Sequence, residues 1–122
     1  MQVKPWIATW EANGIPAEIN ADAFPSVTHM MDAAMRKYAD KPAFRSFGQT
    51  LTYSDMDRLS AAFAAWLQTK LGVQKGDRIA VMAPNLLAFP IVFLGIARAG
   101  AVQVNVNPMY TPRELEHQLN DA

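Results

Sequence analysis

The sequence predicts an α/β fold whose centre is a βαβ unit with parallel strands. Two runs dominated by apolar residues, 78–83 and 101–106, have the length and composition of buried strands. An apolar run of helical length, residues 86–99, lies between them and is followed by Gly100. A strand, a helix and a second strand joined by short links almost always form a right-handed crossover onto a parallel sheet. Amphipathic helices and a small hairpin are expected to precede this unit.

Residues 1–25 are predicted to form an irregular N-terminal arm. Prolines and a glycine interrupt each short run in this segment, so no regular element of ordinary length is expected. Trp6, Ile7 and Trp10 are apolar residues of the arm, and we expect them to pack on the body of the protein or on a partner.

The first amphipathic helix is predicted to begin after Ser26, which suits an N-cap position better than a nucleophilic role. Pro42 ends this helix, because the residue before a proline is pushed out of helical geometry. Its apolar residues recur at spacings of three and four, which is one face of a helix, and the three methionines among them are expected to fill the core. The apolar residues are Val27, Met30, Met31, Ala34, Met35 and Tyr38.

A hairpin is predicted next. Residues 43–47 and 50–53 are rich in aromatic and β-branched side chains, and Gly48-Gln49 between them suggests the turn.

The second helix is predicted to start at a capping box formed by Ser54 and Asp57. Phe63 and Trp66 lie on its apolar face and are expected in the core. Gly72 follows Leu71 as a plausible C-terminal cap.

The ends of the last two helices carry proline signals. Asn85 is expected to cap the helix at 86–99, and Pro90 predicts a distorted start or a kink in it. Thr111 and Glu114 form a capping box for a final helix, with Pro112 at its first position, where a missing N–H does no harm.

Composition excludes several classes of function. The chain has 122 residues, no cysteine, and eleven basic against eleven acidic residues, so thiolate chemistry and an electrostatic attraction to nucleic acid are not expected. The two histidines, His29 and His117, are far apart and the glycines form no phosphate-binding loop, which predicts no metal site. The uncharged stretch 79–97 is interrupted by Pro84 and Pro90, so two buried elements explain it better than a membrane span.

A series of short strings resembles the opening of the acyl- and aryl-CoA ligases of the adenylate-forming superfamily. The order and spacing of the strings match across almost the whole chain. They are Tyr38-Ala39-Asp40-Lys41-Pro42-Ala43, Leu51-Thr52-Tyr53, Gly76-Asp77-Arg78-Ile79-Ala80-Val81, Pro84-Asn85, Gly95-Ile96-Ala97-Arg98-Ala99-Gly100-Ala101 and Asn105-Val106-Asn107-Pro108-Met109-Tyr110-Thr111-Pro112-Arg113-Glu114-Leu115. Residues 107–121, together with Glu18-Ile19-Asn20, look most similar to bacterial long-chain fatty-acid–CoA ligases.

This resemblance implies a two-step reaction in a complete enzyme. A fatty-acid carboxylate attacks the α-phosphate of Mg²⁺-bound ATP to give an acyl-adenylate and pyrophosphate, and the thiol of CoA then displaces AMP. The family's phosphate loop, its nucleotide and metal motif and its mobile C-terminal lysine do not occur in this sequence. We therefore expect a truncated N-terminal portion of the AMP-binding domain at residues 26–122, without catalytic or metal-binding residues and without activity or bound ATP, CoA or Mg²⁺ of its own.

The resemblance also suggests where a ligand path could pass. Ligand crevices in open α/β sheets lie beyond the carboxyl ends of the strands. Asn107, Tyr110 and Thr111 are therefore candidates to border a CoA or acyl path, although a turn followed by a helix cap explains the same residues and is favoured by the local pattern.

Two alternatives stay open. The parent enzyme could be a related aryl- or medium-chain acyl-CoA ligase, or the segment could be a self-association module without an enzymatic role. A cut parallel sheet exposes strand edges, and an apolar arm can exchange between chains, so a homodimer or a larger species is expected. The absence of cysteine fits a reducing cytosol, so the parent is expected in the cytoplasm, and the lipid substrate that the resemblance implies suggests at most peripheral contact at the inner face of the membrane.

Overall fold

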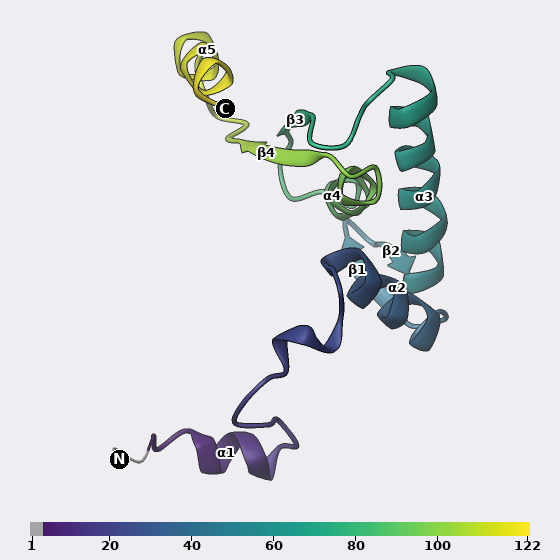
Figure 1. Ribbon diagram of the computed structural model, residues 1–122, viewed down its shortest axis with the longest axis vertical. Coiled ribbons are helices and arrows are strands. Elements are labelled where there is room, and N and C mark those ends of the chain that lie inside the picture. The colour runs from purple at the N-terminus through teal and green to yellow at the C-terminus, as the bar shows by residue number, and fades with distance from the viewer. Residues whose placement is uncertain (1–3) are drawn as a thin grey trace.

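The computed structural model of the chain describes residues 4–122. Within them a βαβ body is flanked by an N-terminal arm and a C-terminal helix, which extend away from it in Figure 1. The body consists of three helices, an antiparallel hairpin and a parallel pair of strands. No helix in this part of the chain is long and apolar enough to cross a membrane.

The βαβ prediction is confirmed. Strand β3 (Arg78–Met82) pairs in parallel with β4 (Val102–Val106), and helix α4 (Ala88–Arg98) connects them. The register places Val81 opposite Asn105 and Met82 opposite Val106, so both strands end at one edge of the sheet. The loops that follow the strands therefore leave the body from the same side.

One face of this small sheet is covered, and the other is covered only in part. Val81 packs with α3 (Tyr53–Lys70) and α4, whereas Met82 is 42% and Val102 is 50% exposed. The prediction of strands buried on both faces is therefore confirmed only in part. On the second face Val106 is 4% exposed, and Leu119 and Ala122 of the C-terminal helix lie beside Ala80 and Val104, but the rest of that face is open.

Helix α4 is the central element of the core. Leu94 and Ile96 are each only 1% exposed, and they join two apolar clusters on opposite sides of the helix. The clusters are Met35, Met56 and Leu94, and Ala64, Leu67, Val81, Ile96 and Ala99. Gly95 lets α3 approach closely, because a β-carbon there would lie 2.7 Å from Cδ1 of Phe63. The three helices and the sheet therefore pack as one body.

The first part of the body follows the predicted order. Ser26 caps α2 (Val27–Lys37) by accepting a hydrogen bond from the backbone N–H of His29. The hairpin β1 (Pro42–Ser46) and β2 (Gln49–Thr52) is antiparallel, and its turn is Phe47-Gly48 instead of the predicted Gly48-Gln49.

Helix α3 begins earlier than predicted. Its N-cap is Thr52, whose side chain accepts the backbone N–H of Asp55, while the carboxylate of Asp55 accepts the backbone N–H of Thr52. The predicted box of Ser54 and Asp57 was therefore wrong. Both pairs have the required spacing, and the hairpin register decides which hydroxyl reaches the helix end.

Two predicted core residues are exposed. Trp66 on α3 is 46% exposed and stacks on Phe63 at a centroid distance of 5.7 Å, and Met30 on α2 is also exposed. Both belong to apolar stripes that are wider than the surface that α4 can cover. Leu71 and Gly72 end α3 as predicted, with Gly72 in the left-handed region.

Helix α4 starts without a side-chain cap. Its N-cap residue is Leu87, not the predicted Asn85, and backbone bonds from Leu86 to Pro84 and from Phe89 to Leu86 form tight turns before the helix. Pro90 falls in the first turn, where the absent N–H has no partner to lose. The distorted start that Pro90 predicted is observed, in the form of these tight turns, without a side-chain cap.

The arm contains two short elements that were not predicted. Helix α1 (Ile7–Ala12) and a 3₁₀ turn at Ala21–Ala23 interrupt an otherwise extended segment. Of residues 4–25, all are exposed except Ile7, which is partly buried. The described part of the arm thus does not pack on the body of its own chain, as Figure 1 shows.

Candidate functional site

The candidate site lies where the chain leaves the carboxyl end of β4. The side-chain oxygen of Asn107 accepts the backbone N–H of Met109 at 3.0 Å, and its carbonyl oxygen accepts the N–H of Tyr110 at 3.1 Å. These bonds turn the chain into helix α5 (Pro112–Asp121). Asn107 therefore shapes the turn with its side-chain oxygen.

Thr111 is occupied by helix capping. Its hydroxyl accepts the N–H of Glu114 and donates to the Glu114 carboxylate at 2.7 Å, and its own N–H donates to the same carboxylate at 2.8 Å. The hydrogen bonds from the Thr111 side chain and backbone lower the pKa of Glu114 below its ordinary value. A carboxylate held in its charged form in this way is poorly suited to act as a general acid.

An open hollow of about 660 Å³ lies over the start of α5 (lined by Tyr110, Thr111, Arg113, Glu114, His117 and Gln118). It contains two of the three predicted residues, Tyr110 and Thr111, and leaves out Asn107. Arg113, His117 and Gln118 were missed by sequence reasoning. Their spacing from Tyr110, at three, seven and eight residues, places them on one face of the predicted helix, which could have identified them.

Gln118 connects α5 to the sheet. Its Nε2 donates to the carbonyl oxygen of Asn105 in β4 at 2.7 Å, while its Oε1 is buried without a partner. Gln103 on β4 likewise leaves its buried Oε1 unpaired and donates from Nε2 to the Asn105 side chain at 2.6 Å. Gln118 thus holds α5 against β4, and neither amide offers an acid or base for catalysis.

A second hollow, the hairpin groove, lies between β1 and the start of α4. It has a volume of about 310 Å³ and is mostly apolar (lined by Phe44, Arg45, Ser46, Asn85, Leu86, Leu87, Phe89 and Pro90). Asn85, the predicted helix cap, borders this groove instead. No local pattern in the sequence indicated the groove, because its walls come from two segments about forty residues apart.

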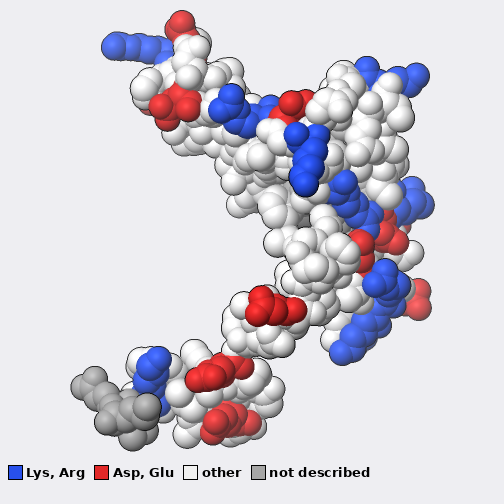
Figure 2. Space-filling view, in the orientation of Figure 1, with Lys and Arg blue, Asp and Glu red and all other residues white. Residues whose placement is uncertain are grey.

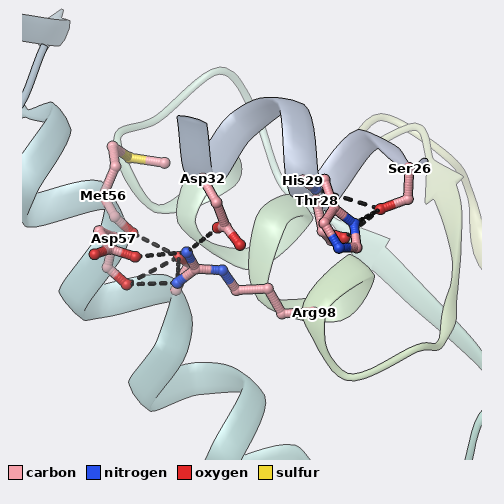
Figure 3. A network of polar contacts seen from close by, with 8 residues as sticks. Ser26, Thr28, His29, Asp32, Met56, Asp57 and Arg98 are labelled. Carbon is pink, nitrogen blue, oxygen red and sulfur yellow. Dashed lines mark hydrogen bonds and ion pairs between the residues drawn. The ribbon is translucent and has the colours of Figure 1, made fainter. Parts of the chain in front are cut away.

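Arg98 links the three helices of the body through a polar network. It extends from α4 to Asp57 on α3 and Asp32 on α2, as Figure 3 shows. Its Nη1 also donates to the carbonyl oxygen of Asp57 at 2.7 Å and to the hydroxyl of the fully buried Ser60 at 3.0 Å. Partial burial alone would lower the pKa of Arg98, but the hydrogen bonds and charges of the two aspartates outweigh it and raise the pKa.

This network and the Ser26 cluster are structural. The guanidinium of Arg98 is surrounded by groups of its own body, and the Ser26 hydroxyl contacts Thr28 and Nδ1 of His29, each at 2.7 Å, at the helix cap (Figure 3). Residues 4–122 include no group of three or more histidine, aspartate or glutamate side chains that could hold a metal ion.

The family follows from the sequence and is supported by the fold. Residues 31–122 match the family described as AMP-binding enzyme. The chain belongs to this family. It is 51% identical over 119 residues, 98% of its length, to a long-chain-fatty-acid–CoA ligase of Salmonella typhimurium, of which it covers 21%. The chain therefore spans about a fifth of the length of the curated relatives it matches.

Solved structures agree with this assignment. The N-terminal subdomain of NpsA from Klebsiella oxytoca has a TM-score of 0.76 at 26% identity, over 80% of this chain and 25% of that one. A benzoate CoA ligase from Burkholderia xenovorans has a TM-score of 0.72 at 28% identity, over 76% and 19%. The structure of this AMP-binding segment is thus the mixed α/β partial domain that the sequence predicted.

Proposed function

We propose that the complete protein is a fatty-acid–CoA ligase that forms an acyl-adenylate from a fatty acid and Mg²⁺-bound ATP and then transfers the acyl group to CoA. The observation that carries this proposal is the 51% identity across 98% of the chain to a long-chain-fatty-acid–CoA ligase. The resemblance of residues 107–121 to bacterial ligases of this class points in the same direction.

We further propose that this segment is scaffold and does not catalyse the reaction alone. The polar groups of Thr111 and Glu114 are used in capping, and Asn107 in its turn, which leaves Tyr110, Arg113 and His117 as side chains that can border a CoA or acyl path. A bordering role needs only shape and charge, which fits the open hollow at the sheet edge.

Pyrophosphate release tests the scaffold proposal. The 122-residue chain, given ATP, Mg²⁺ and palmitate, is expected to release no more pyrophosphate than the same mixture without protein. A complete fatty-acid–CoA ligase serves as the positive control. Turnover above the protein-free rate, abolished by heating the sample, would overturn the proposal.

A parent with an aryl substrate is the main alternative. The identity of 28% to the benzoate CoA ligase, against 51% to the fatty-acid enzyme, favours the long-chain class. The complete protein is expected to turn over palmitate with a higher kcat/KM than octanoate or benzoate. A preference for benzoate or for octanoate would identify the other class.

Self-association is a second candidate function of this segment. The parallel sheet consists of two strands, so each has an outer edge with unpaired backbone groups within the described residues, and such edges template pairing. The exposed arm adds apolar surface. Light scattering over a range of concentrations is expected to show a dimer or larger species, and a constant monomer mass would contradict this candidate.

Location is proposed from the absence of cysteine and from the lipid substrate that the resemblance implies. We place the complete protein in the cytoplasm, with at most peripheral contact at the inner face of the membrane. Cell fractionation tests this location, and flotation with vesicles that contain anionic lipid tests the contact. Recovery of the protein only with integral membrane proteins would contradict it.

A further inference from the structure

The hairpin groove continues along β1 to the tip of the hairpin. A neighbouring hollow of about 290 Å³ shares Ser46, Leu86 and Leu87 with the groove and reaches Phe47. The two hollows together therefore form one extended trough between the hairpin and the segment that leads into α4. A trough of this form suits an unbranched apolar chain better than a compact ligand.

The trough has apolar walls and a single charge. Arg45 is the charged residue among those that line the two hollows. It is exposed, and no carboxylate of residues 4–122 forms an ion pair with it. In Figure 2 the charged side chains of the body gather over α2 and α3, where blue and red groups lie side by side. Arg45 thus differs from them as a cation without an acidic neighbour, next to an apolar surface.

Phe47, at the end of the trough, is a residue that the hairpin turn does not favour. Its φ of 47° lies in the left-handed region, and its side chain is 91% exposed. Strained residues are concentrated at functional sites, where the surrounding contacts or a ligand offset their cost. The ring gains burial only when something lies in the trough beside it, so a bound apolar chain supplies the contact that the chain alone lacks.

We propose that this trough binds a free fatty acid, with the acyl chain against Leu86, Leu87 and Phe47 and the carboxylate on Arg45. The groove of about 310 Å³ equals about ten water volumes of about 30 Å³ each, which is room for about ten carbon atoms of the chain. The choice of a fatty acid among anionic amphiphiles rests on the proposed ligase function. The inference goes beyond that function because it assigns binding to residues 44–47 and 86–90 of a segment proposed as scaffold.

A free fatty acid matches the trough better than an anionic bilayer does. Both present an acyl chain with a negative head, but binding to a bilayer surface relies on clusters of basic residues. The trough has one cation, which pairs with one carboxylate through a charge-assisted hydrogen bond. Its concave walls can also surround a single chain, which a flat interface does not need.

Titration of the 122-residue chain with laurate tests the site without ATP or CoA. Amide chemical shifts are expected to change at residues 44–47 and 85–89, and calorimetry measures the dissociation constant. Arg45→Gln is expected to raise that constant about tenfold, because it removes the partner of the carboxylate. Decanoate, which is two methylene groups shorter, is expected to bind about tenfold more weakly than laurate.

Phe47→Asn separates binding from folding. It is expected to weaken laurate binding at least threefold, although the asparagine suits the turn and does not destabilise the chain. Two matched controls lie away from the trough. Arg36→Gln removes an exposed cation of α2, and Phe24→Asn removes an exposed ring of the arm, and each is expected to change the dissociation constant less than twofold. Circular dichroism checks that every variant is folded.

The outcomes separate this inference from the proposed function. Absence of saturable laurate binding, or shift changes gathered at residues 110–118 instead of the trough, overturns the inference and leaves the ligase proposal standing. Equal weakening by Arg36→Gln and Arg45→Gln also overturns it. Flotation with phosphatidylglycerol vesicles that depends on Arg45 and Phe47, without laurate binding, overturns it in favour of a bilayer. A complete protein that prefers benzoate rejects the ligase proposal, whereas saturable laurate binding in the trough still supports the site.

Discussion

Phe47 is the one described non-glycine residue with a positive φ, and it forms the hairpin turn together with Gly48. The values of 47° and 77° match the two-residue turn whose twist suits a hairpin, in which asparagine and glycine are the preferred residues. Phe47 is 91% exposed, so its ring contributes little burial to offset the backbone strain.

Replacing Phe47 with asparagine is therefore expected to stabilise the chain by about 0.5–1 kcal/mol, or a few degrees in Tm. Gly48→Ala is the matched change in the opposite direction. A β-carbon there would meet nothing within 4 Å, but the left-handed φ disfavours it. Thermal unfolding by circular dichroism measures both variants, and a lower Tm for Phe47→Asn would contradict the prediction.

Arg98 is expected to be the side chain whose charge matters most for the stability of the body. Arg98→Met leaves Asp32 and Asp57 without a cation and Ser60 without a donor, which is expected to cost about 1–2 kcal/mol, since both carboxylates are partly exposed. Arg98→Lys is expected to recover only part of this loss, because one ammonium group cannot reproduce the planar fork.

Arg58→Met is the control for Arg98. Arg58 also pairs with an aspartate, at 3.3 Å, but its side chain is largely exposed. Its loss is expected to cost no more than about 0.5 kcal/mol. Urea unfolding compares the three variants with the unmodified chain, and equal losses for Arg98→Met and Arg58→Met would remove the special role of the network.

At the scale of elements, the helix caps give the sharpest comparison between sequence and structure. Thr52→Ala is expected to destabilise the chain by about 1 kcal/mol, because it removes the hydroxyl that caps α3. Ser54→Ala, at the position that the sequence favoured, is expected to stay within about 0.5 kcal/mol of the unmodified chain. The reverse order in urea unfolding would restore the box predicted at Ser54.

The capping carboxylates also predict a response to pH. Bonds from the backbone N–H and hydroxyl of Thr52, with Arg58, lower the pKa of Asp55, and Thr111 lowers that of Glu114. A carboxyl group whose folded pKa lies below its unfolded value contributes stability above the unfolded pKa of about 4, and this contribution is lost as the pH falls through the folded pKa.

Thr111→Ala is therefore expected to raise the pKa of Glu114 toward its ordinary value, and Thr111→Ser to keep it low. Carboxyl chemical shifts followed through an acid titration measure this directly. An unchanged Glu114 titration in Thr111→Ala would show that the hydroxyl and the cap geometry do not set its pKa.

At the scale of the whole molecule, the sequence predicted the order of elements well and their surroundings poorly. The βαβ unit, the hairpin, the Ser26 cap and the box of Thr111 and Glu114 were predictable, because periodicity and capping depend on neighbouring residues. The exposure of Met82 and Trp66 depends on which faces other segments cover, and no local pattern encodes that.

The candidate site follows the same division. Tyr110 and Thr111 were predicted because a strand, a turn and a helix can each be recognised from neighbouring residues. The structure shows that both line the same hollow. The network of Arg98 joins residues 38 to 66 positions apart in sequence, and the hairpin groove brings together β1 and the start of α4, which lie about as far apart. Both features could be recognised only once the packing of α4 against the hairpin and α3 was known.

Hydrogen exchange tests this division of the molecule. Amides of α3 and α4 are expected to exchange slowest, since these helices carry the buried core, and amides of α1 close to the rate of an unstructured peptide at low protein concentration. If the arm takes part in the proposed self-association, its protection rises with protein concentration. Strong protection of α1 that is independent of concentration would show that the arm packs on its own chain. That result would contradict the extended arm of the structure.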